Sequence, residues 1–129
     1  MTFKLRFAAI GIAIAGVSAG IGVFAAEHSL HQYPPPFPRQ GAVKVLENGR
    51  VVVWDVTWPK GYRSPMHEHY GDSVIVTLAG GTVRTFPLHG QSSIAAFKAG
   101  SVSFAPKGTV HSEEGISDVP RHAIVIQLK

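Results

Sequence analysis

The sequence contains no cysteine. This absence excludes disulfide bonds, thiolate zinc sites, iron–sulfur clusters and a cysteine nucleophile. Charged residues are also scarce, at 16% of the chain against 45% hydrophobic residues, a balance that differs from that of disordered tails and coiled coils. With 129 residues, the chain has room for one globular domain.

A concentrated positive surface is lacking as well. The chain has 12 Lys and Arg residues against 8 Asp and Glu residues, a formal charge of +4. Two of the cations precede residue 7, so residues 26–129 carry ten cations against eight anions. No cluster interleaves Lys or Arg with aromatic residues, and nucleic acid is therefore not an expected partner.

The N-terminus has the pattern of a targeting segment. Lys4 and Arg6 precede an uncharged run over residues 7–26, and Val23 and Ala25 occupy the small-residue positions of a cleavage site. We therefore expect residues 1–25 to be a cleaved signal peptide and the protein to be periplasmic or secreted. The alternative is an uncleaved anchor, because about 20 apolar residues can span a bilayer. Only in that case is a membrane an expected partner.

Residues 26–41 differ from the rest of the chain. The stretch 27–40 holds four of the nine prolines and shows no periodicity, which favours an extended proline-rich N-terminal arm. His28 and His31 fall in this arm, and we expect both to be solvated rather than to bind a ligand.

From residue 42 to 129, short apolar runs alternate with turn signals and show no helical periodicity. An Asn48-Gly49 turn between two such runs predicts a β-hairpin. The pattern predicts seven strands, at residues 43–46, 51–56, 74–78, 82–86, 93–97, 101–104 and 123–128. Strands at this spacing indicate an all-β domain, either a sandwich or a closed barrel.

Three histidines form a candidate metal site. His67 and His69 are two residues apart, so in a strand both imidazoles face the same side. His111 follows a Pro106–Gly108 turn that directs the next strand. Three converging neutral imidazoles suit a divalent transition metal such as Fe, Mn, Zn, Cu or Ni. The His-x-His pair by itself is weak evidence for a metal site, because histidine pairs are common on protein surfaces.

Glycine and proline positions around these histidines complete two longer motifs. They read G-x5-H-x-H-x10-G over residues 61–80 and G-x5-P-x-G-x2-H over residues 100–111. These resemble the two signature motifs of the cupin superfamily. The resemblance implies a double-stranded β-helix, or jelly-roll barrel, over residues 42–129, with His67, His69 and His111 binding the metal inside the barrel mouth. Cupins commonly dimerise through sheet edges, so the resemblance also makes a homodimer one expected assembly.

Two positions depart from the family pattern. The glutamate that usually follows the second histidine is replaced by Ser73 or Val74, with Asp72 one place early, and Gly115 stands where the second motif usually ends in Asn. Without that carboxylate the ligands are neutral, so a bound ion keeps its full +2 charge and favours an anionic or chelating ligand. Either Asp72 or Ser73 remains a candidate to replace the missing glutamate ligand.

The sequence leaves three functions open. A metal-dependent dioxygenase is one, because three-histidine cupins occur among such enzymes; zinc in the same site would instead support hydration or hydrolysis. The second is a non-catalytic module that holds a sugar, an acid or a metal ion in the barrel mouth. The third is a structural protein with a vestigial site. In either of the first two cases the expected partner is a small molecule.

The remaining notable polar and aromatic residues are expected on the surface or in the core rather than in the metal site. Glu68 is expected on the solvated surface, and Glu113 in an exposed polar loop unless it orients an imidazole. Trp54 and Trp58 are expected in the core. Metal affinity is expected to fall on acidification through pH 6.5, the usual pKa of histidine, because a protonated imidazole cannot bind a metal.

Overall fold

In the computed structural model, residues 31–129 are described and fold into nine strands without a helix. The predicted signal peptide and the first five residues of the N-terminal arm lie outside the described residues. No segment within residues 31–129 forms a helix suited to crossing a membrane. The strands are β1 (Ala42–Glu47), β2 (Val51–Trp58), β3 (His67–Glu68), β4 (Ser73–Ala79), β5 (Gly81–Pro87), β6 (Ser93–Phe97), β7 (Val102–Ala105), β8 (Val110–Gly115) and β9 (Arg121–Leu128).

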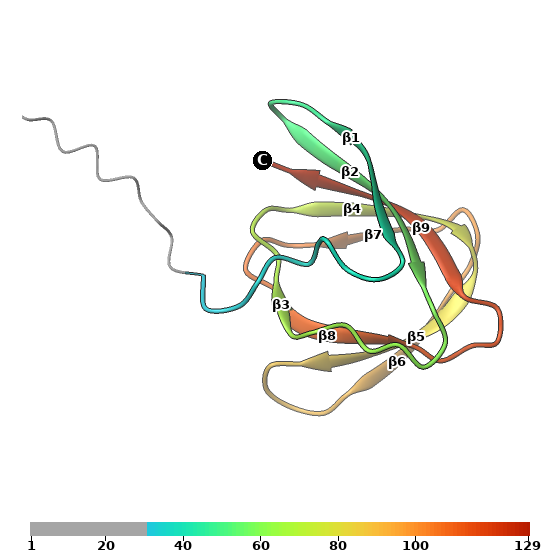
Figure 1. Ribbon diagram of the computed structural model, residues 1–129. Helices are drawn as coiled ribbons and strands as arrows, with labels where there is room; N and C mark the ends of the chain where they lie inside the picture. Colours follow the sequence, from blue (N-terminus) through green and yellow to red (C-terminus); the bar gives the residue numbers. More distant parts are fainter. Residues whose placement is uncertain (1–30) are drawn as a thin grey trace, which may run out of the picture.

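The strands form two facing sheets, as Figure 1 shows. One sheet has the order β1-β2-β9-β4-β7 and the other has the order β3-β8-β5-β6. Every pairing between these strands is antiparallel. The prediction of an all-β jelly-roll barrel is therefore confirmed.

All seven strands expected from the sequence are present, and the Asn48-Gly49 turn joins β1 to β2. The side chain of Asn48 stabilises this turn by accepting hydrogen bonds from the backbone N–H groups of Arg50 and Val51, at 2.8 and 3.1 Å. Strand β8 was expected to be a loop after its first residues, and this was wrong. Apolar alternation does not reveal this strand, because its sequence VHSEEG is polar and its pocket-facing residues are His111 and Glu113.

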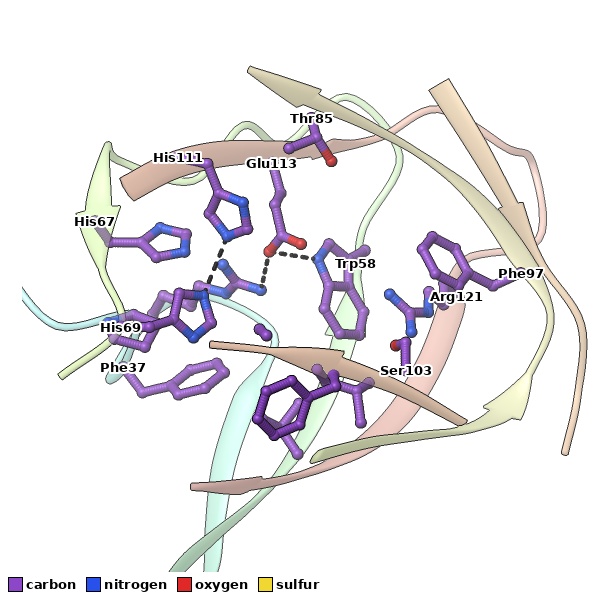
Figure 2. A pocket seen from close by; sticks show the side chains of 16 residues that line it. Phe37, Trp58, His67, His69, Thr85, Phe97, Ser103, His111, Glu113 and Arg121 are labelled. Carbon is purple, nitrogen blue, oxygen red and sulfur yellow. Dashed lines mark hydrogen bonds and ion pairs between the residues drawn. The ribbon is translucent and has the colours of Figure 1, made fainter. Parts of the chain in front are cut away.

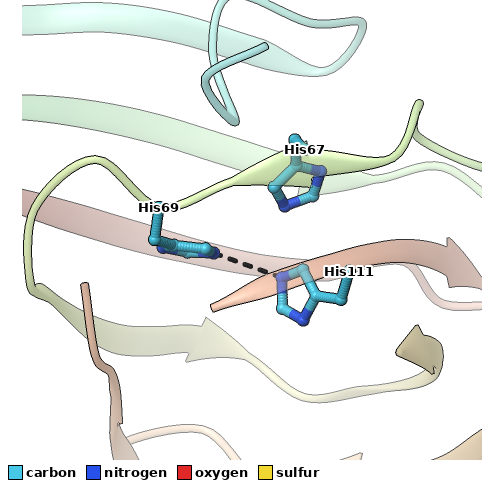
Figure 3. Close-up of side chains that lie close together, drawn as sticks. All are labelled: His67, His69 and His111. Carbon is cyan, nitrogen blue, oxygen red and sulfur yellow. Dashed lines mark hydrogen bonds between the residues drawn. The ribbon is translucent and has the colours of Figure 1, made fainter. Parts of the chain in front are cut away.

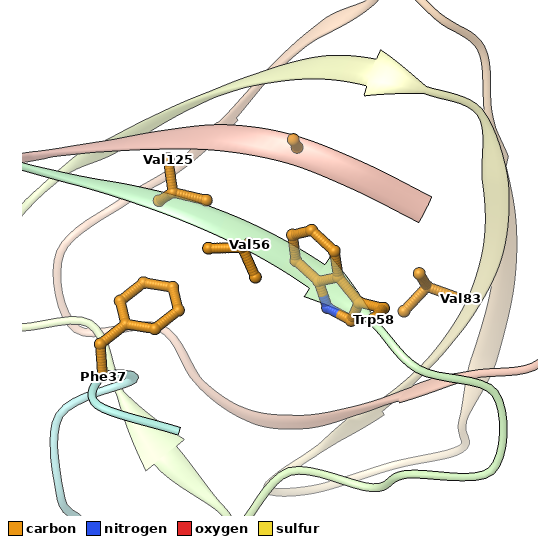
Figure 4. Packing of buried hydrophobic residues seen from close by; sticks show 6 residues of the cluster. Phe37, Val56, Trp58, Val83 and Val125 are labelled. Carbon is orange, nitrogen blue, oxygen red and sulfur yellow. The ribbon is translucent and has the colours of Figure 1, made fainter. Parts of the chain in front are cut away.

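The core lies between the two sheets (Figure 4). Val56 and Trp58 point inward from β2, and the paired strand β9 adds Ala123 opposite Val56. Val56 and Trp58 point the same way because residues two apart in a strand share a face. Trp54 is partly buried against the same core, so the expectation of core packing holds for both tryptophans. The remaining core residues are Phe37, Val83 and Val125.

The N-terminal arm packs against the barrel along residues 31–41. Phe37 belongs to the core and stacks on Trp54 with ring centroids 4.9 Å apart. The Pro34 carbonyl accepts a hydrogen bond from the Glu68 backbone, and the Tyr33 carbonyl accepts one from the Tyr70 hydroxyl. This part of the arm is therefore a component of the domain rather than a linker that precedes it.

We predict that Phe37→Ala lowers the free energy of unfolding by about 3 kcal/mol, because it removes a buried ring and leaves a void in the core. Phe104→Ala is the matched control, since Phe104 is 60% exposed and Phe37 only 7%. The control should cost about 1 kcal/mol or less. Urea denaturation measures both, and equal losses would show that the arm does not contribute to the core.

Candidate metal centre

The three predicted histidines lie close together (Figure 3). His67 in β3 lies directly opposite His111 in β8, so the two form a cross-strand pair. His69 lies just beyond β3, but its backbone continues the pairing: its N–H donates to the Thr109 carbonyl at 2.9 Å, and its carbonyl accepts from the Gly108 N–H at 2.8 Å. The turn before β8 thus holds the second histidine in line with the first.

Nitrogen atoms of His67, His69 and His111 all lie within 4.8 Å of one another. Nε2 of His69 is 3.2 Å from Nε2 of His111. Two nitrogens bound at about 2.1 Å to one tetrahedral ion lie about 3.4 Å apart, so this pair already has the spacing of ligands.

The hydrogen bonding of His67 sets its tautomer. Its Nδ1 lies 3.0 Å from the Pro65 carbonyl oxygen, and a carbonyl accepts only, so Nδ1 carries the proton. Nε2 therefore presents its lone pair to the cluster, and this atom is buried without a hydrogen-bond partner. A backbone carbonyl behind a ligating histidine is the usual support in metal sites. These donors fit a divalent transition metal.

The missing carboxylate is not replaced by Asp72. Oδ1 of Asp72 accepts a hydrogen bond from the Lys107 backbone N–H at 2.8 Å and so supports the turn before β8. Ser73 is completely buried, and its hydroxyl lies 3.5 Å from Nδ1 of His69, where it orients that ring. Within residues 31–129 the cluster contains histidines alone, so its donor set is neutral.

The histidines open onto a cavity of about 200 Å³ inside the barrel, shown in Figure 2. Its wall includes the core residues Phe37 and Trp58. Three charged side chains also line it: Glu113, Arg39 and Arg121. Drug-sized ligands occupy pockets of about 300–1,000 Å³, so this cavity suits a smaller molecule.

Glu113 was expected in an exposed loop, and the structure corrects this. Its carboxylate is buried in the pocket, where Oε2 accepts hydrogen bonds from Nη2 of Arg39 at 3.0 Å and from Nε1 of Trp58 at 3.1 Å. Burial by itself raises the pKa of this carboxyl, but Arg39, the neighbouring His111 and His67, and the indole N–H together hold the pKa at about 2. Glu113 lies two residues beyond His111 in β8, and strand alternation is the signal that places both on one face.

His31 and Glu68 were both expected to be solvated, and both are half-buried. Nδ1 of His31 lies 2.9 Å from Oε1 of Glu68, and its ring stacks on Tyr70 at 3.6 Å between centroids. These contacts hold the start of the arm against the strand that carries His67. Neither residue joins the metal cluster, in agreement with the sequence analysis.

The comparisons with known proteins agree with the fold. No protein-family model matches the chain, and no curated protein matches its sequence. Several solved structures, however, match the chain in three dimensions. A cupin domain from Bordetella pertussis Tohama I is 26% identical, with 72% of this chain and 98% of that chain covered and a TM-score of 0.62. An RmlC-like cupin with a double-stranded β-helix fold from Methanocaldococcus jannaschii is 14% identical, with coverages of 71% and 85% and a TM-score of 0.58.

A third similar structure is DMSP lyase DddQ from Ruegeria pomeroyi DSS-3, with 18% identity and a TM-score of 0.54. This match covers 78% of the chain and 57% of the lyase. Together the two sheets and these neighbours define the fold class, a double-stranded β-helix of the cupin type. The chain is thus a cupin-fold protein with three histidines gathered inside its barrel.

Burial changes the expected pH dependence of the site. His67 and His69 are 2% and 6% exposed. Burial, which disfavours the protonated ring, lowers the pKa of each to about 4, and it also lowers the pKa of His111. Protons compete with a metal only where the imidazoles become charged. These lowered pKa values move the expected competition to a more acidic pH than the 6.5 expected from the sequence.

We predict that Zn²⁺ affinity changes little between about pH 7.5 and pH 5.5 and falls steeply as the pH approaches about 4. Chelator competition at each pH measures the affinity, and far-UV circular dichroism shows whether the barrel stays folded. A tenfold loss centred on about pH 6.5 would contradict the effect of burial.

Proposed function

We propose that His67, His69 and His111 hold one divalent transition metal ion. The observation that carries the proposal is the buried, unpartnered Nε2 of His67 facing two further imidazoles. An ordinary core histidine has both nitrogens satisfied, whereas Nε2 of His67 has no hydrogen-bond partner among the described residues. Fe, Mn, Zn, Cu and Ni all accept such donors.

The site is proposed to act on a small anionic or chelating molecule. Three neutral donors leave the charge of a divalent ion uncompensated. Arg39 and Glu113 neutralise each other, and Arg121 adds a further positive charge to the wall. A cavity of about 200 Å³ with this balance of charge favours a small organic anion that reaches the histidines.

The proposed reaction class is oxidation of that molecule by O2, with both oxygen atoms entering the product. The chemistry that a bound ion supplies is polarisation of an anionic donor group and, for iron(II), electron transfer to O2. The protein's own residues position the substrate and exclude water. Glu113 is held ionised by Arg39 and Trp58, and a carboxylate with a pKa of about 2 is a poor general base.

One observation favours a non-catalytic alternative. Among the residues described, Glu113 is the one carboxylate that lines the pocket, and it is already committed to an ion pair. A site without a free protein base also suits a module that binds a small acid, a sugar or a metal ion without turnover. The two functions differ in whether O2 is consumed.

Export to the periplasm or the medium remains part of the proposal. The basic start, uncharged run and small residues of the first 25 positions support it. A homodimer is also proposed. Strand β1 is at the edge of its sheet and exposes Val43 and Val45 at 64% and 55%, an apolar edge that a second copy can cover.

We predict near-stoichiometric iron in protein isolated from its native compartment, and its loss in His69→Ala, which removes one of three ligands. Elemental mass spectrometry measures the metal. The matched control is His122→Ala, because His122 pairs with Asp55 outside the pocket and should leave the metal content unchanged.

Oxygen uptake with small anionic chelators then separates the two functions. Uptake that requires His69 supports the oxygenase, and ligand-induced stabilisation without uptake supports the binding module. No metal in the wild-type protein, or the same metal content in both variants, would contradict the three-histidine site.

A further inference from the structure

A buried arginine lies at the far end of the pocket from the histidines (Figure 2). Arg121 is the first residue of β9 and is 3% exposed. Its guanidinium carbon lies 3.5 Å from the ring centroid of Phe97 and 4.7 Å from that of Trp58. The aromatic faces therefore hold the guanidinium at a defined place in the cavity wall.

The hydrogen-bonding capacity of Arg121 is only partly used. Nη2 donates to the Thr77 hydroxyl at 3.0 Å, whereas Nε is buried without a partner. Within residues 31–129, no carboxylate lies within ion-pair distance of this guanidinium. A buried charge normally carries a counter-charge, because desolvation without one is costly.

The other charged groups in the pocket do not supply that counter-charge. Glu113 is the nearest candidate, but its Oε2 accepts from Arg39 and Trp58. Arg39 and Glu113 together are neutral, so the wall retains the single positive charge of Arg121. The missing anion is therefore one that enters the cavity.

We propose that Arg121 binds the carboxylate of a short organic acid whose other end carries a second oxygen-donor group directed to the three histidines. A carboxylate matches the planar guanidinium of Arg121, which lines the cavity and has no ion-pair partner within residues 31–129. Trp58 lies between the two ends and packs against the carbon chain. The second half of this inference rests on the proposed metal site, and the carboxylate contact does not.

The probes are the dicarboxylates malonate, succinate, glutarate and adipate, titrated calorimetrically into metal-free and zinc-loaded protein. We expect at least one of them to bind the wild type, and zinc to strengthen that binding. Arg121→Met should weaken the binding by about 10- to 100-fold in both forms, the effect of losing a charge-assisted contact.

The matched control is Arg84→Met. Arg84 lies in β5 between Val83, which is buried, and Thr85, which lines the pocket, so its side chain faces away from the cavity. This variant loses the same charge and should keep the wild-type affinity. Inorganic phosphate, titrated in parallel, should bind more weakly than the best dicarboxylate.

A purely structural role for Arg121 predicts a different result. Loss of a structural arginine lowers the melting temperature, whereas removal of an uncompensated buried charge leaves it unchanged or raises it. We expect the second outcome for Arg121→Met without ligand. If that variant does not fold, Arg121→Lys serves instead, because it keeps the charge but lacks the planar edge and should also lose affinity.

Unchanged dicarboxylate affinity in the Arg121 variant, stronger binding of phosphate, or no binding to either form of the wild type would overturn the inference. Failure of the metal site is seen separately, as zinc stoichiometry that His69→Ala does not change. In that event Arg121-dependent binding to the metal-free protein still supports the carboxylate contact.

Discussion

The ion pair between Arg39 and Glu113 is the contact on which the interior of this barrel depends. Both side chains are largely buried, at 6% and 15% exposure, and they come from segments 74 residues apart. A buried pair adds little net stability, but loss of one partner leaves an unpaired charge and typically costs about 3–5 kcal/mol. The pair therefore ties the N-terminal arm to β8 and constrains how the arm crosses the pocket.

This pairing also sets the chemistry of the cavity. Glu113 pairs with Arg39, accepts a hydrogen bond from Trp58 and is not part of the histidine cluster, and its pKa of about 2 makes it a poor proton acceptor. The histidines are left as a neutral donor set, and Arg121 is left as an uncompensated cation. With the proposed metal ion bound, the pocket has two separate places for negative charge, and its size limits the molecule that can use both.

The N-terminal arm supplies a core residue, part of the pocket wall and one partner of the buried ion pair. Phe37 stacks on Trp54, Arg39 pairs with Glu113, and His31 contacts Glu68 beside the first ligand. A proline-rich segment has few conformations to lose on ordering, which lowers the entropic cost of fixing it against the barrel. The jelly roll alone would leave this side of the pocket without a wall.

Much of the fold could be predicted from local sequence. Alternating apolar residues and turn signals located seven strands, and the spacing of His67, His69 and His111 with glycines and a proline indicated both the barrel and the cluster. Strand β8 was incompletely predicted because its inward side chains are polar. Its sequence therefore lacks the apolar alternation by which a buried face is recognised.

The sequence by itself determined the all-β class and the three histidines, because alternation and turn chemistry act over a few residues. Only the tertiary structure decided that Arg39, Glu113 and Arg121 face one cavity. Their roles depend on which segments oppose each other across the barrel, and long-range packing sets that arrangement. Burial then determines which charges are neutralised and which remain to meet a ligand.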